Sequence, residues 1–244
     1  MKRRPNTRRQ PRSVRCGALL ALVLGLTHCG ATPMPEPPSL DGGLIGVAPV
    51  GIVVLSEPRL LPIAGQPGAA TPGASVRVID LDTRDPGVST TAASDGSFAL
   101  TVPVRSGDEL RLQAQTDSAR SEPVDLIYRS VELVDTLEPS PRHDCVTLDP
   151  GFEVAFAGSV SRSLRVQNAC SGPIVLAAPR FRLDGADFEL ETLLPLTLPA
   201  GSEGRLDLTR LSPTPPTRED VLFVDVSLAD QVLRYPIGLF APGE

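Results

Sequence analysis

Residues 94–102 read Ser94-Asp-Gly-Ser-Phe-Ala-Leu-Thr-Val102, a turn that runs directly into a strand pattern. The Asp95-Gly96 pair supplies the positive φ angles that tight hairpin turns require, so a hairpin turn is expected here. After the turn, Phe98, Leu100 and Val102 alternate with small or polar residues and fall on one face of a strand. A strand with one apolar and one polar face is typical of an antiparallel sheet that covers a core on one side only.

The same alternation recurs on both sides of this stretch. Val76 and Val78 share one face of the strand predicted at 74–82. In the strand predicted at 109–115, Leu110, Leu112 and Ala114 are expected to point inward. Arg111 and Gln113 lie on its polar face and are expected to point into water. A stretch rich in Pro, Gly and Ala, residues 60–72, is expected to form a loop. The strands predicted for this part of the chain are 50–55, 74–82, 88–92, 98–102, 109–115 and 131–137.

A second series of short alternating segments follows a Pro-rich stretch, residues 138–144, that is expected to link two domains. Leu164 and Val166 share the inner face of one of these segments. Many short segments joined by turns, in a chain that lacks Trp, are typical of an antiparallel sandwich. The segments are 163–168, 174–176, 181–184, 188–191, 205–209, 224–228 and 233–237. The chain is therefore predicted to be all-β, with two antiparallel β-sandwich domains at 44–137 and 145–244.

Both predicted domains resemble modules that exported bacterial proteins carry. The first is similar to carboxypeptidase-regulatory-like and bacterial Ig-like modules, and the second to Ig-like domains of the Hydin and major-sperm-protein type. The first resemblance rests on Pro72-Gly73-Ala74-Ser75-Val76, Ala93-Ser94-Asp95-Gly96-Ser97-Phe98 and Val102-Pro103. The second rests on Leu164–Asn168, Gly185–Phe188 and Leu198–Gly201. The first resemblance implies a small antiparallel sandwich without catalytic residues of its own, of a kind that serves as a spacer, adhesive unit or docking surface. The second implies another Ig-like sandwich.

The N-terminal part of the chain has the pattern of an export signal. Seven Lys or Arg residues lie within residues 1–16, and no acidic residue precedes Glu36. The apolar run that follows, residues 17–26, is much shorter than the roughly 20 residues that a membrane-spanning helix requires. A basic flank and a short apolar core are typical of a removable signal peptide.

The residues that follow this core, Leu26-Thr27-His28-Cys29-Gly30, resemble a bacterial lipobox. The resemblance implies that Cys29 receives a diacylglycerol and becomes the first residue after cleavage. Residues 1–28 are then the signal peptide, and residues 29–43 are a lipidated, Pro-rich tether. His28 stands where the family usually has Gly, Ala or Ser, so export without acylation is the alternative. The residue after the cysteine is not the Asp that retains enteric lipoproteins at the inner membrane, which favours the outer membrane.

The charge of the chain narrows the choice of partners. The full sequence carries 23 basic and 29 acidic residues, and the predicted signal contains seven of the basic residues and none of the acidic ones. The mature chain would have a net charge of −13, which disfavours binding to nucleic acid. The single lysine, Lys2, lies in the predicted signal, so the mature chain has no lysine for Schiff-base or P-loop chemistry. The expected partners are the membrane, through the lipid, and an envelope protein or polysaccharide.

The four cysteines predict one disulfide bond. Cys16 leaves with the predicted signal and Cys29 is assigned to the lipid. Cys145 and Cys170 remain as the pair expected to bond in an oxidising compartment. Closure of this loop would stabilise the fold by roughly 3–4 kcal/mol in the chain-entropy model. Two free thiols, or a bond from one of them to another partner, are the alternative.

No group of residues in the sequence has the spacing of a catalytic or metal site. The acidic stretch Asp80-Leu-Asp82-Thr-Arg-Asp85 can be read as a calcium loop. An EF-hand loop would need an acid or Asn where Arg84 stands and a Glu where Thr91 stands. His143 lies in the predicted linker without further metal ligands or a nucleophile nearby in the sequence. We therefore predict no metal, no cofactor and no catalytic residue. The alternative is a hydrolase that acts on polysaccharide through carboxylates brought together by the fold.

Overall fold

The structure is a computed structural model that describes residues 36–48, 58–117, 119–131, 134–211 and 217–243. In this described part nearly every regular element is a β-strand, apart from a short 3-10 helix, η1 (Gly42–Leu44). The predicted all-β fold class is therefore confirmed. None of the described residues belongs to a helix with the length and apolar character needed to cross a bilayer. The predicted signal peptide, Cys29 and the strand predicted at 50–55 lie outside the described residues.

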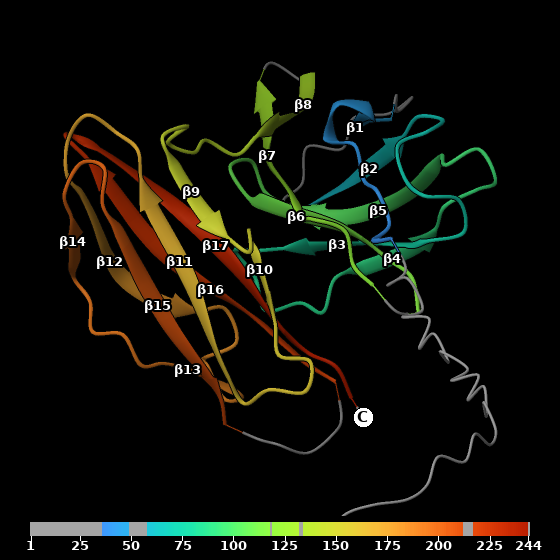
Figure 1. Cartoon of the computed structure of the whole chain (residues 1–244). Helices are drawn as coiled ribbons and strands as arrows, with labels where there is room; N and C mark the ends of the chain where they lie inside the picture. Colours follow the sequence, from blue (N-terminus) through green and yellow to red (C-terminus); the bar gives the residue numbers. More distant parts are fainter. Residues whose placement is uncertain (1–35, 49–57, 118, 132–133, 212–216, 244) are drawn as a thin grey trace, which may run out of the picture. The chain divides into compact units, whose positions relative to one another are not determined.

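The described residues of the first sandwich form two antiparallel sheets. Their strands are β1 (Ile45–Val47), β2 (Arg59–Gly65), β3 (Ser75–Asp80), β4 (Val88–Thr91), β5 (Phe98–Val104), β6 (Glu109–Gln115), β7 (Val124–Val131) and β8 (Val134–Pro139). One sheet has the order β1-β2-β5 and the other β4-β3-β6-β7-β8 (Figure 1). Alternate side chains of both sheets point into one apolar core, where Ile63, Val78 and Leu112 are fully buried.

The second sandwich also consists of two sheets around a core of its own. Its strands are β9 (Val146–Asp149), β10 (Glu153–Ala155), β11 (Ser161–Asn168), β12 (Ile174–Phe181), β13 (Phe188–Leu190), β14 (Leu196–Leu198), β15 (Glu203–Arg210), β16 (Arg218–Leu228) and β17 (Gln231–Ala241). The sheet orders are β13-β15-β11-β9 and β10-β17-β16-β12-β14. All described pairs are antiparallel except β10 with β17, which is parallel. Leu164 and Val166 lie in the core, as predicted.

The loop predicted at residues 60–72 is wrong for its first half, which forms β2. Leu61 and Ile63 alternate into the core, and this alternation outweighs the high Pro and Gly content that suggested a loop. Pro62 lacks an N–H group. The residues of β2 that pair with β1 are Gly65, Ala64 and Ile63, so this ladder stops one position short of Pro62. The proline therefore fits the strand without breaking a bond of that ladder.

The turn predicted around Asp95-Gly96 is present, but it does not make a hairpin. The strand before it, β4, belongs to the five-stranded sheet, and the strand after it, β5, belongs to the three-stranded sheet. Gly96 has a φ of +82° and lies so close to the Ala70 carbonyl that a side chain would collide with it. Gly68 donates a backbone hydrogen bond of 2.7 Å to the Asp95 carbonyl. These contacts hold the turn against the β2–β3 connection, so the chain crosses between sheets.

Smaller differences concern missed strands and the ends of elements. Besides β2, the strands without a counterpart among the predicted ones are β1, β7, β9, β10 and β14. β8 begins at Val134 and includes Glu138 and Pro139, which the sequence placed in the linker. Of the strand predicted at 181–184, only Phe181 belongs to a strand, as the last residue of β12. The predicted domain boundaries stay predictions, because residues 35–244 form a single compact unit.

Candidate functional site between the two sandwiches

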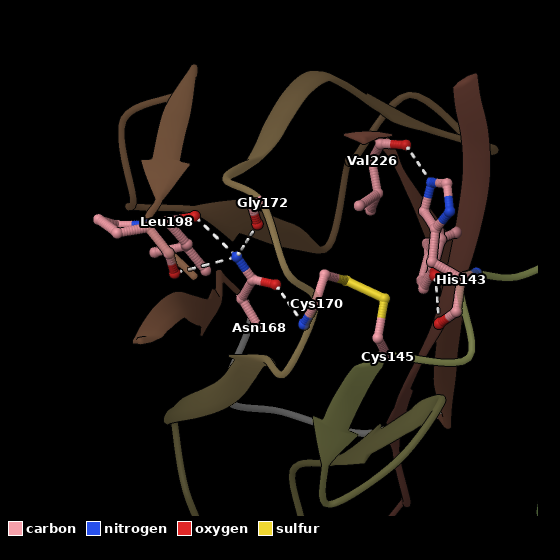
Figure 2. The surroundings of a disulfide bond; sticks show 9 residues. His143, Cys145, Asn168, Cys170, Gly172, Leu198 and Val226 are labelled. Carbon is pink, nitrogen blue, oxygen red and sulfur yellow. Dashed lines mark hydrogen bonds between the residues drawn. A yellow bond between two sulfur atoms is a disulfide. The ribbon is translucent and has the colours of Figure 1, made fainter. Parts of the chain in front are cut away.

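The predicted disulfide between Cys145 and Cys170 is present, with the two Cα atoms 4.9 Å apart. It joins the segment before β9 to the turn after β11 (Figure 2). Beside it, Asn168 is fully buried and its Oδ1 accepts the Cys170 N–H at 3.0 Å. The Asn168 amide nitrogen donates to the carbonyls of Gly172 at 3.0 Å and Leu198 at 2.9 Å. The disulfide and this amide together fix one end of the second sandwich.

His143 does not lie in an open linker, as the sequence suggested. It is 6% exposed, and its main-chain N–H donates to the Tyr235 hydroxyl at 2.7 Å. The ring atom Nε2 lies 3.1 Å from the Val226 carbonyl and donates to it, because a carbonyl can only accept (Figure 2). These two bonds assign His143 a structural role in closing the second sandwich.

Arg111 is the centre of an interface between the two sandwiches, formed by the outer faces of the sheets that contain β6 and β17. The sequence predicted that Arg111 faces water, but it is only 3% exposed. Its guanidinium makes a bidentate pair with Asp125 at 2.8 and 2.9 Å, and it donates to the Pro236 carbonyl of β17 at 2.6 Å. Burial alone would lower the pKa of Arg111, but Asp125, together with the nearby Glu109 and Glu153, outweighs burial and raises it. Arg111 therefore stays charged inside the interface.

A second ion-pair group crosses the same interface. Arg234 of β17 donates to Glu109 at 2.6 and 2.9 Å and to Asp82 at 2.6 and 3.2 Å. Burial opposes the charge of Arg234, but the bonds to these two carboxylates raise its pKa overall. Arg142, in the connection between the sandwiches, bonds to Glu109 and Asp125 at 3.1 Å each. The two sandwiches are thus joined by charged groups that neutralise one another.

A third group lies further along the interface, around Glu219 of β16. Glu219 pairs with Arg77 of the first sandwich, and with Arg120 at 3.0 Å. Burial raises the pKa of Glu219, but the hydrogen bond and charge of Arg77 lower it below the ordinary value. The Arg120 guanidinium also covers the ring of Phe240, with its carbon 3.7 Å from the ring centroid.

The acidic stretch at residues 80–85 does not bring its three aspartates together as a calcium loop would. The carboxylates that gather are Asp80, Asp82 and Asp108, with oxygens within 4.8 Å of one another, and Asp85 is not among them. Asp80 is 5% exposed; burial, opposed by the Asp82 N–H and reinforced by Asp108, raises its pKa to about 6. Arg234 is bound to Asp82, so Asp80 is the carboxyl of this group that binds its proton more tightly than an exposed aspartate does.

No protein-family model matches the chain, and no curated protein matches it. Some solved structures do match it at low identity. The CsuC–CsuE chaperone–tip adhesin complex from archaic Csu pili of Acinetobacter baumannii is 20% identical, over 41% of this chain and 57% of that chain, with a TM-score of 0.34. The VesB protease of Vibrio cholerae is 9% identical, over 70% of this chain and 62% of that chain, with a TM-score of 0.37.

The D0-D1 domain of intimin is 9% identical, over 75% of this chain and 90% of that chain, with a TM-score of 0.28. The chain spans less than two thirds of the length of the matched chains of the CsuC–CsuE complex and of VesB. Similarities at this level carry no argument about function. The β-sandwich modules rest on the strands themselves, and the particular module families suggested by the sequence stay predictions.

Proposed function

We propose that the chain is an exported protein of the bacterial cell envelope, anchored by a lipid on Cys29, that acts by binding, adhesion or scaffolding without chemistry. The disulfide between Cys145 and Cys170 carries most of this proposal, because such bonds persist outside the reducing cytoplasm. The basic, apolar and lipobox-like segments of residues 1–30 supply the export signal and the acylation site. Two or more acyl chains hold a protein at a membrane far better than one.

The joined sandwiches suit a role in presenting surfaces to a partner. The interface fixes one sandwich on the other through Arg111 and Arg234, so the two would move as one body on the tether. Edge strands such as β4 and β13 offer main-chain groups to an added strand. An envelope protein or polysaccharide, met at these edges or at the loops, is the proposed partner, and the outer membrane is the proposed location.

The same proposal makes the protein non-catalytic. Burial raises the pKa of Glu153 and of Asp220, and both line an interface cavity of about 30 Å³. Pockets that bind small molecules usually enclose about 300–1,000 Å³, so this shared cavity is too small for a sugar ring. Glu153 also lines a larger pocket of about 290 Å³, but Asp220 does not, so the two carboxyls do not meet there. We expect no release of reducing sugar from cell-wall polysaccharide. Release that disappears in Glu153→Gln would favour the alternative, a carboxylate-based hydrolase.

Metabolic labelling with radioactive palmitate in a bacterial host tests the anchor. The wild-type chain is expected to take up label and sediment with membranes, whereas Cys29→Ala should do neither. Cys16→Ala is the matched control, because this cysteine lies in the predicted signal and should leave labelling intact. Label that survives in Cys29→Ala would remove the proposal.

The second candidate is an exported protein of the same fold without a lipid. His28, at a position where lipobox sequences usually have a small residue, is the observation that favours it. Cleavage at another site, seen in the mass of the mature N-terminal peptide, would support this candidate. His28→Ala separates the two, because it should increase the acylated fraction only if His28 slows processing.

A further inference from the structure

The interface contains a small, partly open cavity, bordered by charged and apolar side chains, that none of the ion pairs fills. Its volume is about 30 Å³, and it lies between β3 and β6 of the first sandwich and β10, β16 and β17 of the second. The charged side chains along its wall are Arg111, Arg120, Arg182, Glu153, Glu219 and Asp220. A space of this size holds one water molecule or one small ion, since a single water needs about 10–15 Å³ by this measure.

Two hydrogen-bond donors on side chains that line this cavity have no partner among the described residues. They are Nη1 of Arg111 and Nε of Arg120, and both atoms are buried. The other nitrogens of Arg111 bond to Asp125 and to the Pro236 carbonyl, so Nη1 alone is left over. A buried donor without a partner destabilises the folded state, because in the unfolded chain it bonds to water. We therefore expect a hydrogen-bond acceptor next to Nη1 of Arg111 and Nε of Arg120.

The position of Nη1 shows why the space stays open. A Cβ atom added to Gly238 of β17 would lie 3.0 Å from Arg111 Nη1, 3.4 Å from the Phe152 carbonyl and 3.6 Å from Glu153 Oε2. Glycine at this position of β17 thus leaves room between a donor of the first sandwich and an acceptor of the second. An occupant here would reach both.

The charges around the cavity are balanced before anything is bound. Three guanidinium groups and three carboxylates line it. The partners just behind them, Asp125 on Arg111 and Arg77 on Glu219, add one charge of each sign. An anion such as chloride would therefore bring an uncompensated buried charge, which is costly. A neutral molecule that both accepts and donates avoids this cost.

We propose that the cavity binds one water molecule, which accepts hydrogen bonds from Arg111 and Arg120 and donates to a carboxylate of the second sandwich. Glu153 of β10 is the carboxylate closest to the open position at Gly238. This water bridges the interface, because it bonds to Arg111 and Arg120 of the first sandwich and to Glu153 of the second.

A crystal structure of the mature protein at high resolution tests the site, with one crystal grown in sodium chloride and one in sodium bromide. The expected result is one fully occupied water within hydrogen-bond distance of Arg111 Nη1 and Arg120 Nε, and no anomalous signal from bromide. A bromide peak in the cavity would overturn the choice of water over an anion. An empty cavity would overturn the site itself.

A pair of glycine substitutions tests the same site in solution. Gly238→Ala places a methyl group in the cavity and is expected to displace the water and lower the urea midpoint of unfolding. Gly46→Ala is the matched control, because a Cβ on this strand glycine of β1 meets nothing within 4 Å. Equal midpoints for the two variants would overturn the bridging role. If Gly238→Ala does not fold, the wild-type crystals still decide.

Discussion

Asn168 is a buried polar residue whose hydrogen bonds are all made by main-chain groups. Its amide bonds to the carbonyls of Gly172 and Leu198 and to the N–H of Cys170. Asn168 is fully buried, and its bonds to the Leu198 carbonyl and to the Cys170 N–H are buried with it. Removal of the amide would leave several of these main-chain groups without partners at once.

Asn168→Ala is expected to lower the free energy of unfolding by about 3 kcal/mol. Urea-induced unfolding of the oxidised protein measures this loss. The control is Gln167→Ala, at the neighbouring exposed position of β11, which should change stability by less than about 0.5 kcal/mol. Similar losses for the two variants would contradict the role given to Asn168.

Asp80 makes stability depend on pH. Burial, opposed by the Asp82 N–H and reinforced by Asp108, raises its pKa from the ordinary 3.8 to about 6. Because the folded-state pKa is the higher one, the folded chain binds the proton more tightly than the unfolded chain. The stabilisation from this group is complete below about pH 4 and is lost as the pH rises through the folded-state value.

Asp80→Asn, which stays neutral at every pH, is expected to remove this loss. Relative to wild type, its free energy of unfolding should rise by about 2 kcal/mol near pH ~8 and change little near pH ~4. Denaturant unfolding across this range measures the difference. Asp85→Asn, an exposed position in the following loop, is the control and should run parallel to wild type. If Asp80→Asn also runs parallel, the carboxyl does not hold the proton.

Among the elements, β6 shows what the sequence predicts and what it leaves open. The alternation of its residues predicted correctly that Leu110, Leu112 and Ala114 point into the core. It could not predict that the opposite face is covered as well, because Arg111 at an outward position normally indicates water. The group of the second sandwich that covers it, the Pro236 carbonyl of β17, is 125 residues away in the sequence. The pair with Asp125 of the next strand has no periodic pattern that the sequence would reveal.

The same distinction holds for the remaining elements. β2 was missed because its proline content suggested a loop, although Leu61 and Ile63 alternate as in any strand. The Cys145–Cys170 pair could be predicted because elimination left only two cysteines. The interface could not, since it depends on how two separately predicted sandwiches meet.

Arg111→Leu tests the buried ion pair of β6. It removes the main cation at Asp125 and is expected to cost about 3–5 kcal/mol in urea unfolding, because a buried carboxylate loses its bidentate partner. The double variant Arg111→Leu/Asp125→Leu should be more stable than the single one, since no unpaired charge is left at this pair. A double variant that is less stable than Arg111→Leu would contradict this view of the interface.

In the whole molecule, two apolar cores are joined through charged groups. The apolar contribution to the joint is a small cluster of Leu81, Val221 and Phe223. Burial would raise the pKa values of Asp82 and Glu219, but Arg234 and Arg77 bond to them and lower them below 3.8 and 4.5. The stabilisation from these two carboxylates is complete when the pH is above their ordinary pKa values. It is lost as the pH falls through their lower pKa values in the folded state. Acid should therefore weaken the joint while each core persists.

The two tyrosines of the chain allow this to be measured, because Tyr128 lies in the first core and Tyr235 in the second. Tyr128→Phe and Tyr235→Phe each leave one reporter for near-ultraviolet circular dichroism. At neutral pH the two variants should unfold at the same urea concentration, once the effect of each substitution on overall stability is subtracted. Near pH ~3 the two transitions are expected to separate. A shared transition at both pH values would mean that charge does not couple the sandwiches.

The proposed function rests on export, cleavage before Cys29 and attachment of a lipid. The most direct test is the intact mass of the native chain purified from its own cells, with its thiols blocked before extraction. We predict a chain from the membrane fraction that begins at an acylated Cys29 and contains the Cys145–Cys170 disulfide. A cytosolic chain that still begins at Met1, with both of these thiols reduced, would contradict the account.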